Sequence, residues 1–157
     1  MRLAYLLLCL VAIASAGRAA APAPQVVVWA GEPERPVACL PLDQGNRFHL
    51  EFINSIYLAP VRETFEYVSG EGVYVVMVES PSAGVFEYYG LEPDKPGVAF
   101  LRRPVGEMRI RSHDYRNHRL TAGETTIFFK GLIKDGEAFT IRVGTEAVCG
   151  SWPSQED

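Results

Sequence analysis

Glu63 is the residue whose type and position point most directly to chemistry, because a carboxylate stands where the local pattern requires an apolar side chain. Over residues 61–67, Val61, Phe65 and Tyr67 share its parity, which is the period-two pattern of a strand with one buried face. A carboxylate on a buried face is costly unless it is hydrogen-bonded or paired. Glu63 is therefore expected to have a partner or to mark a bend in the strand.

Two further polar residues are expected near Glu63 in the folded chain. Residues 48–54 form another alternating strand, and Asn54 ends it on the parity of its apolar residues, with Ser55 next in the chain. In one interpretation, Glu63 accepts hydrogen bonds from Ser55 or from the backbone and holds the connector at residues 54–60 in place. In the other, Asn54, Ser55 and Glu63 form a small polar binding pocket together with His118.

Arginines are concentrated in residues 102–119, which hold six of them against two acidic residues. Within the strand expected at 107–112, Arg109 and Arg111 share one face at a spacing that suits an anion. A solvated strand face that keeps a sheet edge from pairing with other chains explains the same pattern. Arg109 and Arg111 are thus candidates for binding a carboxylate, a phosphate or an acidic protein surface.

Signatures of common enzymes are absent from the sequence, which has no HExxH zinc motif, no Walker phosphate loop and no GxSxG nucleophile motif. The alternative to a non-enzymatic binding domain is a small hydrolase or metal-dependent enzyme that uses Glu63, His118 and Asp114. A metal at His113 and His118 requires the backbone to turn between them and a carboxylate such as Asp114 to join. The sequence predicts no catalytic residue, no metal and no cofactor.

The N-terminus indicates export. Residues 1–16 combine Arg2, an apolar run and small residues ahead of a cleavage site after Ala16, which is the pattern of a secretory signal peptide. A retained membrane anchor is the alternative, although the run is shorter than the roughly 20 residues that a spanning helix needs. We expect a periplasmic or secreted protein that keeps no membrane span, with residues 17–24 as a flexible leader rich in Ala and Pro.

Composition and charge narrow the possible partners. The chain has 157 residues, of which 48% are hydrophobic and 22% charged, and this suits one globular domain. Its net charge of -4 at pH 7 becomes -5 when Arg2 leaves with the signal peptide. Such a chain lacks the basic excess that a nucleic-acid backbone attracts, so nucleic acid is not expected as a partner.

Two cysteines remain after signal cleavage, Cys39 and Cys149, near the two ends of the expected domain. In an exported chain this number favours one disulfide. Such a bond closes a loop of about 110 residues and stabilises the fold by about 4 to 5 kcal/mol in the chain-entropy model. A metal or redox pair of thiols is the alternative, but the sequence lacks a CxxC spacing.

Short apolar segments alternate with turn residues, and the chain after the signal peptide shows no convincing helical period over about 12 residues. This pattern predicts an all-β fold, either an antiparallel β-sandwich or a flattened barrel, of about nine short strands. Residues 85–89 are interpreted as one of the short strand pieces, and no helix is required. The predicted organisation is a single all-β domain over residues 25–150, followed by a C-terminal tail at 151–157.

Residues 52–56 (FINSI) and 60–65 (PVRETF) resemble the signature of a small exported bacterial family of unknown function, whose genes commonly accompany TRAP-type transporters of the TAXI class. The family pattern is aromatic-x-His-Ser-Val, a short gap, then Pro-Val-x-Glu-x-Phe. Downstream, Ala83-Gly84 is similar to part of a family turn, and His118-Arg119-Leu120 resembles a family His-Arg-Leu.

The resemblance spans roughly residues 36–144 and implies an exported accessory domain near solute uptake. Together with the arginine segment, it makes a transporter component or a small anionic solute the expected partner. Asn54 stands where the family has its histidine. An asparagine side chain forms hydrogen bonds but does not exchange protons at ordinary pH. The substitution therefore favours a structural or binding role for this cluster over catalysis.

Overall fold

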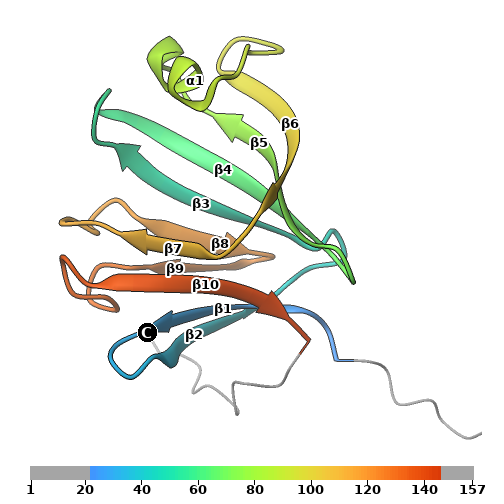
Figure 1. The fold of residues 1–157 in the computed structure, drawn as a ribbon, viewed down its shortest axis with the longest axis vertical. Coiled ribbons are helices and arrows are strands. Elements are labelled where there is room, and N and C mark those ends of the chain that lie inside the picture. Colours follow the sequence, from blue (N-terminus) through green and yellow to red (C-terminus); the bar gives the residue numbers. More distant parts are fainter. Residues whose placement is uncertain (1–21, 146–157) are drawn as a thin grey trace, which may run out of the picture.

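The computed structural model describes residues 22–145, which form two antiparallel sheets and one short helix (Figure 1). The four-stranded sheet has the order β2-β1-β10-β7, and the six-stranded sheet has the order β6-β5-β4-β3-β8-β9. The predicted all-β sandwich is confirmed. The two sheets do not close into a barrel, and the described residues contain ten strands where about nine were predicted.

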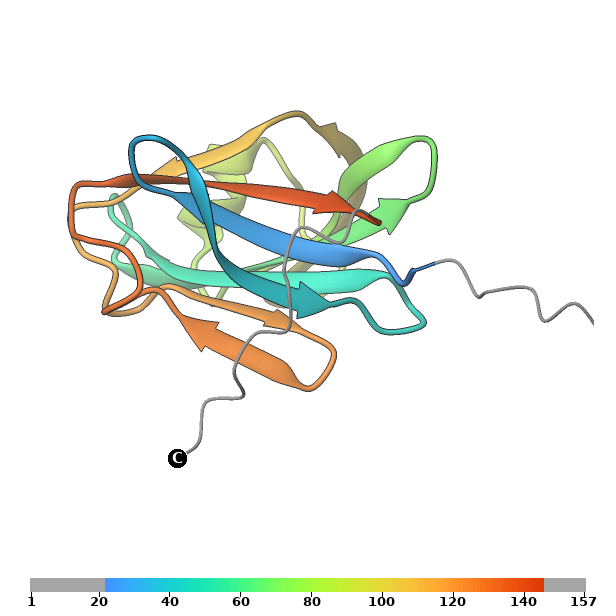
Figure 2. The same cartoon turned by 90° about the horizontal axis from the view of Figure 1, so that it is seen from below.

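The elements follow one another along the chain with short connections. They are β1 (Gln25–Ala30), β2 (Arg35–Pro41), β3 (Arg47–Asn54), β4 (Ala59–Val68), β5 (Gly72–Glu79), α1 (Ala83–Tyr89), β6 (Val98–Val105), β7 (Met108–Arg111), β8 (Arg119–Ala122), β9 (Thr125–Phe128) and β10 (Ala138–Gly144). Figure 2 views the molecule from the side of the four-stranded sheet, where β1 (blue) runs beside β10 (red), although the two strands come from opposite ends of the chain.

Several sequence-based predictions concern residues outside the described range. They are the signal peptide at 1–16, the first part of the leader, Cys149 and the tail at 151–157. Cys39 lies in β2, but Cys149 is outside the described residues. Their predicted disulfide therefore stays a prediction. Within residues 22–145, no helix has the length and apolar character that a membrane crossing requires.

The hairpin of β3 and β4 has the alternation that the sequence predicts. Leu50 pairs with Glu63, and Phe48 pairs with Phe65, whose ring it meets at a centroid distance of 4.9 Å. Phe48 and Phe65 are buried between the sheets. The pairing of β3 with β4 continues without a break through Glu63, whereas the pairing of β4 with β5 shifts its register between Thr64 and Phe65, one residue further on.

The inner face of the six-stranded sheet is covered by two different partners. The four-stranded sheet covers one part of it, and Phe65 belongs to that main core. Helix α1 covers the other part, where Val85 and Phe86 pack against Val61 of β4. Figure 1 shows α1 at the end of the molecule farthest from the four-stranded sheet. Glu63 lies between Val61 and Phe65 on the same strand, and therefore at the boundary between these two covered regions.

Residues 83–89 correct the prediction of a strand at 85–89, because they form α1. Val85, Phe86 and Tyr89 are spaced so that they share one face of a helix, and in so short a window this spacing resembles a strand pattern. Gly90 ends the helix in the left-handed conformation, with φ of 64°, and its N–H donates to the carbonyl of Glu87.

Gly84 allows α1 to approach the connection between β3 and β4. A Cβ atom at this position would lie 2.3 Å from Cε1 of Tyr57, which is far inside any real contact. Only glycine therefore permits this packing without displacement of the Tyr57 ring. The contact fixes α1 beside the hairpin that carries Asn54 and Glu63, and so places the helix at the edge of the candidate site.

Candidate functional site

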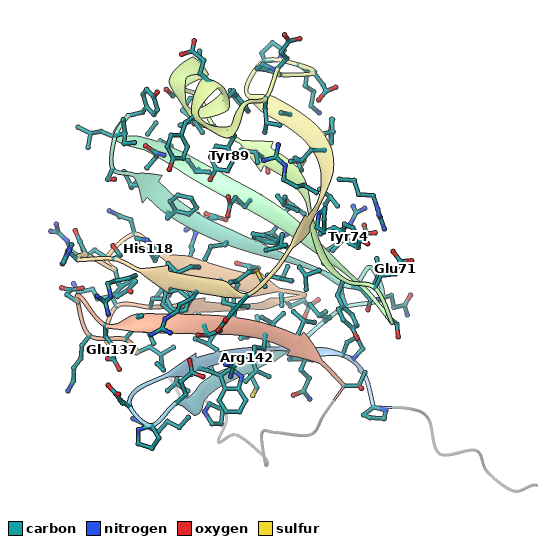
Figure 3. All side chains as sticks on the ribbon, viewed as in Figure 1. Glu71, Tyr74, Tyr89, His118, Glu137 and Arg142 are labelled. Carbon is teal, nitrogen blue, oxygen red and sulfur yellow. The ribbon has the colours of Figure 1, made fainter. Side chains whose placement is uncertain are left out.

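A pocket of about 370 Å³ lies between α1 and β7, over the inner face of β3 and β4. Five of the six predicted binding residues line it, namely Asn54, Ser55, Glu63, Arg111 and His118. They come from β3, the connection after it, β4, β7 and the residue preceding β8. Figure 3 shows two lining residues, Tyr89 below α1 and His118 near β7, on opposite sides of this space.

The sixth predicted residue, Arg109, does not line this pocket. A larger pocket of about 690 Å³ lies between the turn joining β1 to β2 and residues 130–137, and no predicted binding residue lines it. The smaller pocket is the candidate site, because it gathers side chains from segments that are far apart in the sequence.

Glu63 has a partner that the sequence did not reveal. Its Oε1 accepts a hydrogen bond of 2.6 Å from the hydroxyl of Tyr89 in α1. Burial raises the pKa of Glu63, and the Tyr89 bond acts in the opposite direction. The pKa of Tyr89 is also raised, first by burial and then by the neighbouring charge of Glu63. The interpretation in which Glu63 bonds to Ser55 or to the backbone is therefore wrong.

The role of holding the connector belongs to Asn54 instead. This residue is 8% exposed, and its Oδ1 accepts hydrogen bonds of 3.0 Å from the backbone N–H groups of Ile56 and Tyr57. Two N–H donors fix the side-chain oxygen toward the turn. Within residues 22–145, the Asn54 NH₂ group has no hydrogen-bond partner, and the residue lines the pocket. Asn54 thus combines a structural oxygen with an available donor.

His118 closes the side of the pocket opposite α1. Its ring stacks on Phe52 at a centroid distance of 5.9 Å and meets Tyr115 edge-on at 5.2 Å. The Nδ1 atom is buried and has no hydrogen-bond partner in the described part of the chain. Burial lowers the pKa of His118, and the charge of Asp114 opposes this shift. The neutral imidazole is therefore the favoured form near pH 7.

Asp114 does not line the pocket, and its carboxylate is paired with another residue. Its carboxylate forms an ion pair of 2.6 Å with Arg116, and hydrogen bonds from Arg116 lower the pKa of Asp114 to about 2. Asp114 and Arg116 are neighbours on the exposed turn that precedes β8. The predicted enzymatic set of Glu63, His118 and Asp114 is thus brought together only in its first two members.

Both predicted arginines lie on β7, which is an edge strand of the four-stranded sheet. Arg109 and Arg111 are exposed, and they alternate with Met108, which is buried, and Ile110, which is partly buried. Neither arginine forms an ion pair with any residue between 22 and 145. The position at an edge suits the interpretation of a protected sheet edge, and the place of Arg111 in the pocket suits the interpretation of an anion site.

Tyr88 and Tyr89 are among the lining residues that sequence reasoning missed. Their segment was interpreted as a strand, so nothing placed them opposite Glu63. The available signal was the spacing of Val85, Phe86 and Tyr89 ahead of Gly90, which suits a short helix with a glycine end.

The comparisons leave the site to be judged on its own geometry. No protein-family model, curated protein or solved structure matches the chain. The resemblance to the transporter-associated family therefore stays a prediction. Among the described side chains, no group of three or more His, Cys, Asp or Glu is placed to hold a metal ion.

Proposed function

We propose that this chain is an exported, non-enzymatic binding domain whose pocket takes a small organic anion. The observation that carries the proposal is the place of Arg111, an arginine without an ion partner among the described residues, in a pocket whose lining is part polar and part apolar. Phe52 and Ile110 belong to the apolar part of this lining. Small-molecule sites typically combine apolar walls with a few converging polar groups, and a guanidinium binds a carboxylate through two parallel hydrogen bonds.

The biological setting belongs to the same proposal. The predicted signal peptide supports a periplasmic or secreted location, and the family resemblance supports an accessory role near TRAP-type solute uptake. A transporter component is then the protein partner. The pocket would deliver or sense the small anion that the transport system handles.

Replacing Arg111 with alanine should weaken binding of a small carboxylate by about 10- to 100-fold, because a charge-assisted hydrogen bond contributes about 1.5 to 3 kcal/mol. The measurement is calorimetric titration with the acids that stabilise the wild-type domain in a thermal-shift screen of organic acids. Arg109→Ala is the matched control, since Arg109 is an exposed arginine on the same strand outside the pocket. Equal losses in the two variants, or no stabilising acid at all, would contradict the proposal.

A second candidate function is a small hydrolase or metal-dependent enzyme, and one observation favours it. Glu63 and His118 line the same open pocket, as an acid and base pair requires. The carboxylate of Asp114 pairs with Arg116, and Asp114 acts on His118 through its charge and its backbone, both of which raise the pKa of His118 against the effect of burial.

The binding proposal predicts no turnover of ester, peptide, phosphate or glycoside substrates above the blank. It also predicts the same metal content in the wild type and in Glu63→Ala and His118→Ala. Turnover that both substitutions abolish would establish the enzyme instead.

A further inference from the structure

Two residues of opposite charge type, Glu63 and Arg111, line the pocket. Among residues 22–145, neither Glu63 nor Arg111 forms an ion pair. They lie on different sheets, Glu63 on β4 and Arg111 on β7, and they line one space.

The outer face of the six-stranded sheet shows the opposite arrangement. There Arg119, Glu51, Arg62 and Glu79 follow one another across β8, β3, β4 and β5, and each neighbouring pair forms an ion pair. Cross-strand pairs of opposite charge stabilise a sheet. Each charge on this face has an ion partner within the protein, although Nε of Arg62 and Oε2 of Glu79 are buried there without a hydrogen bond, whereas Glu63 and Arg111 have no ion partner among the described residues.

Glu63 has capacity for another donor. Tyr89 donates to Oε1, while Oε2 has no partner among the described residues and is not closed off from the pocket. An ionised carboxylate accepts several hydrogen bonds, and a partly buried one is costly without a compensating charge. An ammonium group supplies three donors and a positive charge in one step.

We propose that the ligand of this pocket is zwitterionic, an α-amino acid with an apolar side chain, whose carboxylate binds Arg111 and whose ammonium group binds Glu63. This inference rests on the proposed function, because it specifies the second charged group of the same small anion. The available NH₂ group of Asn54 adds a donor for the carboxylate. Leu50 and Phe52 provide apolar surface for the side chain.

The volume agrees with a ligand of this class. A pocket of about 370 Å³ lies near the lower end of the range of roughly 300 to 1,000 Å³ for small-molecule sites. A single amino acid fits such a site better than a long chain or a nucleotide. Tyr88, which is 62% exposed, stands at the α1 side of the pocket and offers an aromatic ring to the ligand.

The test compares ligands that differ by one charged group. Leucine carries both groups, isocaproate lacks the ammonium group and isoamylamine lacks the carboxylate, and all three have nearly the same apolar body. Each is titrated against the wild-type domain and against Glu63→Gln, Arg111→Ala and the control Arg109→Ala. Glu63→Gln keeps an oxygen that can accept from Tyr89 but removes the negative charge. Far-ultraviolet circular dichroism checks that each variant is folded.

The proposal expects leucine to bind the wild type about tenfold more tightly than isocaproate or isoamylamine, since each ionic hydrogen bond adds more than 1 kcal/mol. In Glu63→Gln, leucine should bind no better than isocaproate, while isocaproate should bind at least as tightly as to the wild type, because the substitution removes a like charge. Equal affinities for leucine and isocaproate in the wild type would overturn the zwitterionic ligand and leave the anion site intact. Binding of neither carboxylate would overturn both proposals.

Discussion

Replacing Tyr115 with alanine should lower the free energy of unfolding by about 3 to 5 kcal/mol, the usual cost of deleting a large aromatic ring from a core. Tyr115 is fully buried at 0% exposure, and its ring packs edge-on against Phe139 at 5.7 Å and beside Phe129. The substitution leaves a cavity between the sheets that these neighbours fill only in part. Urea unfolding followed by circular dichroism measures the loss.

The Tyr115 hydroxyl adds a second, separable effect. It accepts a hydrogen bond of 2.9 Å from the N–H of Ser112 and donates one of 2.5 Å to the carbonyl of Glu137. Tyr115→Phe keeps the ring and leaves both backbone groups without a partner, at a cost of about 1 to 3 kcal/mol. The turn that these bonds fix carries Ser112 and His118 into the pocket. A Tyr115→Phe variant as unstable as Tyr115→Ala would show that the ring contributes nothing beyond its hydroxyl.

Removing the predicted disulfide should have an effect of similar size. Loss of a bond that closes a loop of about 110 residues should destabilise the domain by about 4 to 5 kcal/mol in the chain-entropy model. Cys39 lies on β2 between Ala38 and Leu40, two residues of the main core, so its side chain belongs to the outer face of the four-stranded sheet. A bond there would tie the beginning of the domain to its C-terminal end.

Three variants separate a disulfide from a simple packing effect. If the bond forms, Cys39→Ser, Cys149→Ser and the double variant should lose the same stability, because each removes the same cross-link. Peptide mapping without reduction should recover Cys39 and Cys149 in one linked fragment. Recovery of the two cysteines in separate peptides from oxidised protein would rule out the bond, and additive losses in the double variant would point to packing alone.

Local patterns accounted for much of the fold. The alternation in residues 48–54 and 61–67 correctly placed Phe48 and Phe65 in the core and Glu63 on the same face, because side chains in a strand point to alternate sides. The same reasoning failed at residues 83–89, where a short amphipathic helix and a strand leave nearly the same pattern. The error hid Tyr89, the hydrogen-bond partner of Glu63.

The sequence predicted some of the residues of the candidate site but not their contacts. Unusual chemistry in a local pattern singled out Glu63 and the arginines of β7, and five of the six predicted residues line one pocket. The sequence did not predict that Arg111 lines the pocket while Arg109 does not, because both have the same parity and the same exposure along an edge strand. The division of roles between Asn54 and Glu63 likewise depends on which donors the folded chain brings within reach.

The sequence by itself determined that this chain is built of short antiparallel strands and that Glu63 lies on an inward face with Val61 and Phe65. Both follow from local periodicity and turn chemistry. Only the tertiary structure decided that the four-stranded sheet ends before Glu63 and that α1 covers the neighbouring part of the six-stranded sheet. It also decided that Arg111 lines the pocket between them. Strand β7 pairs with β10 across a long separation in sequence, and no local pattern specifies that pairing. The pocket is therefore a product of sheet order, which brings together residues that lie far apart in the sequence.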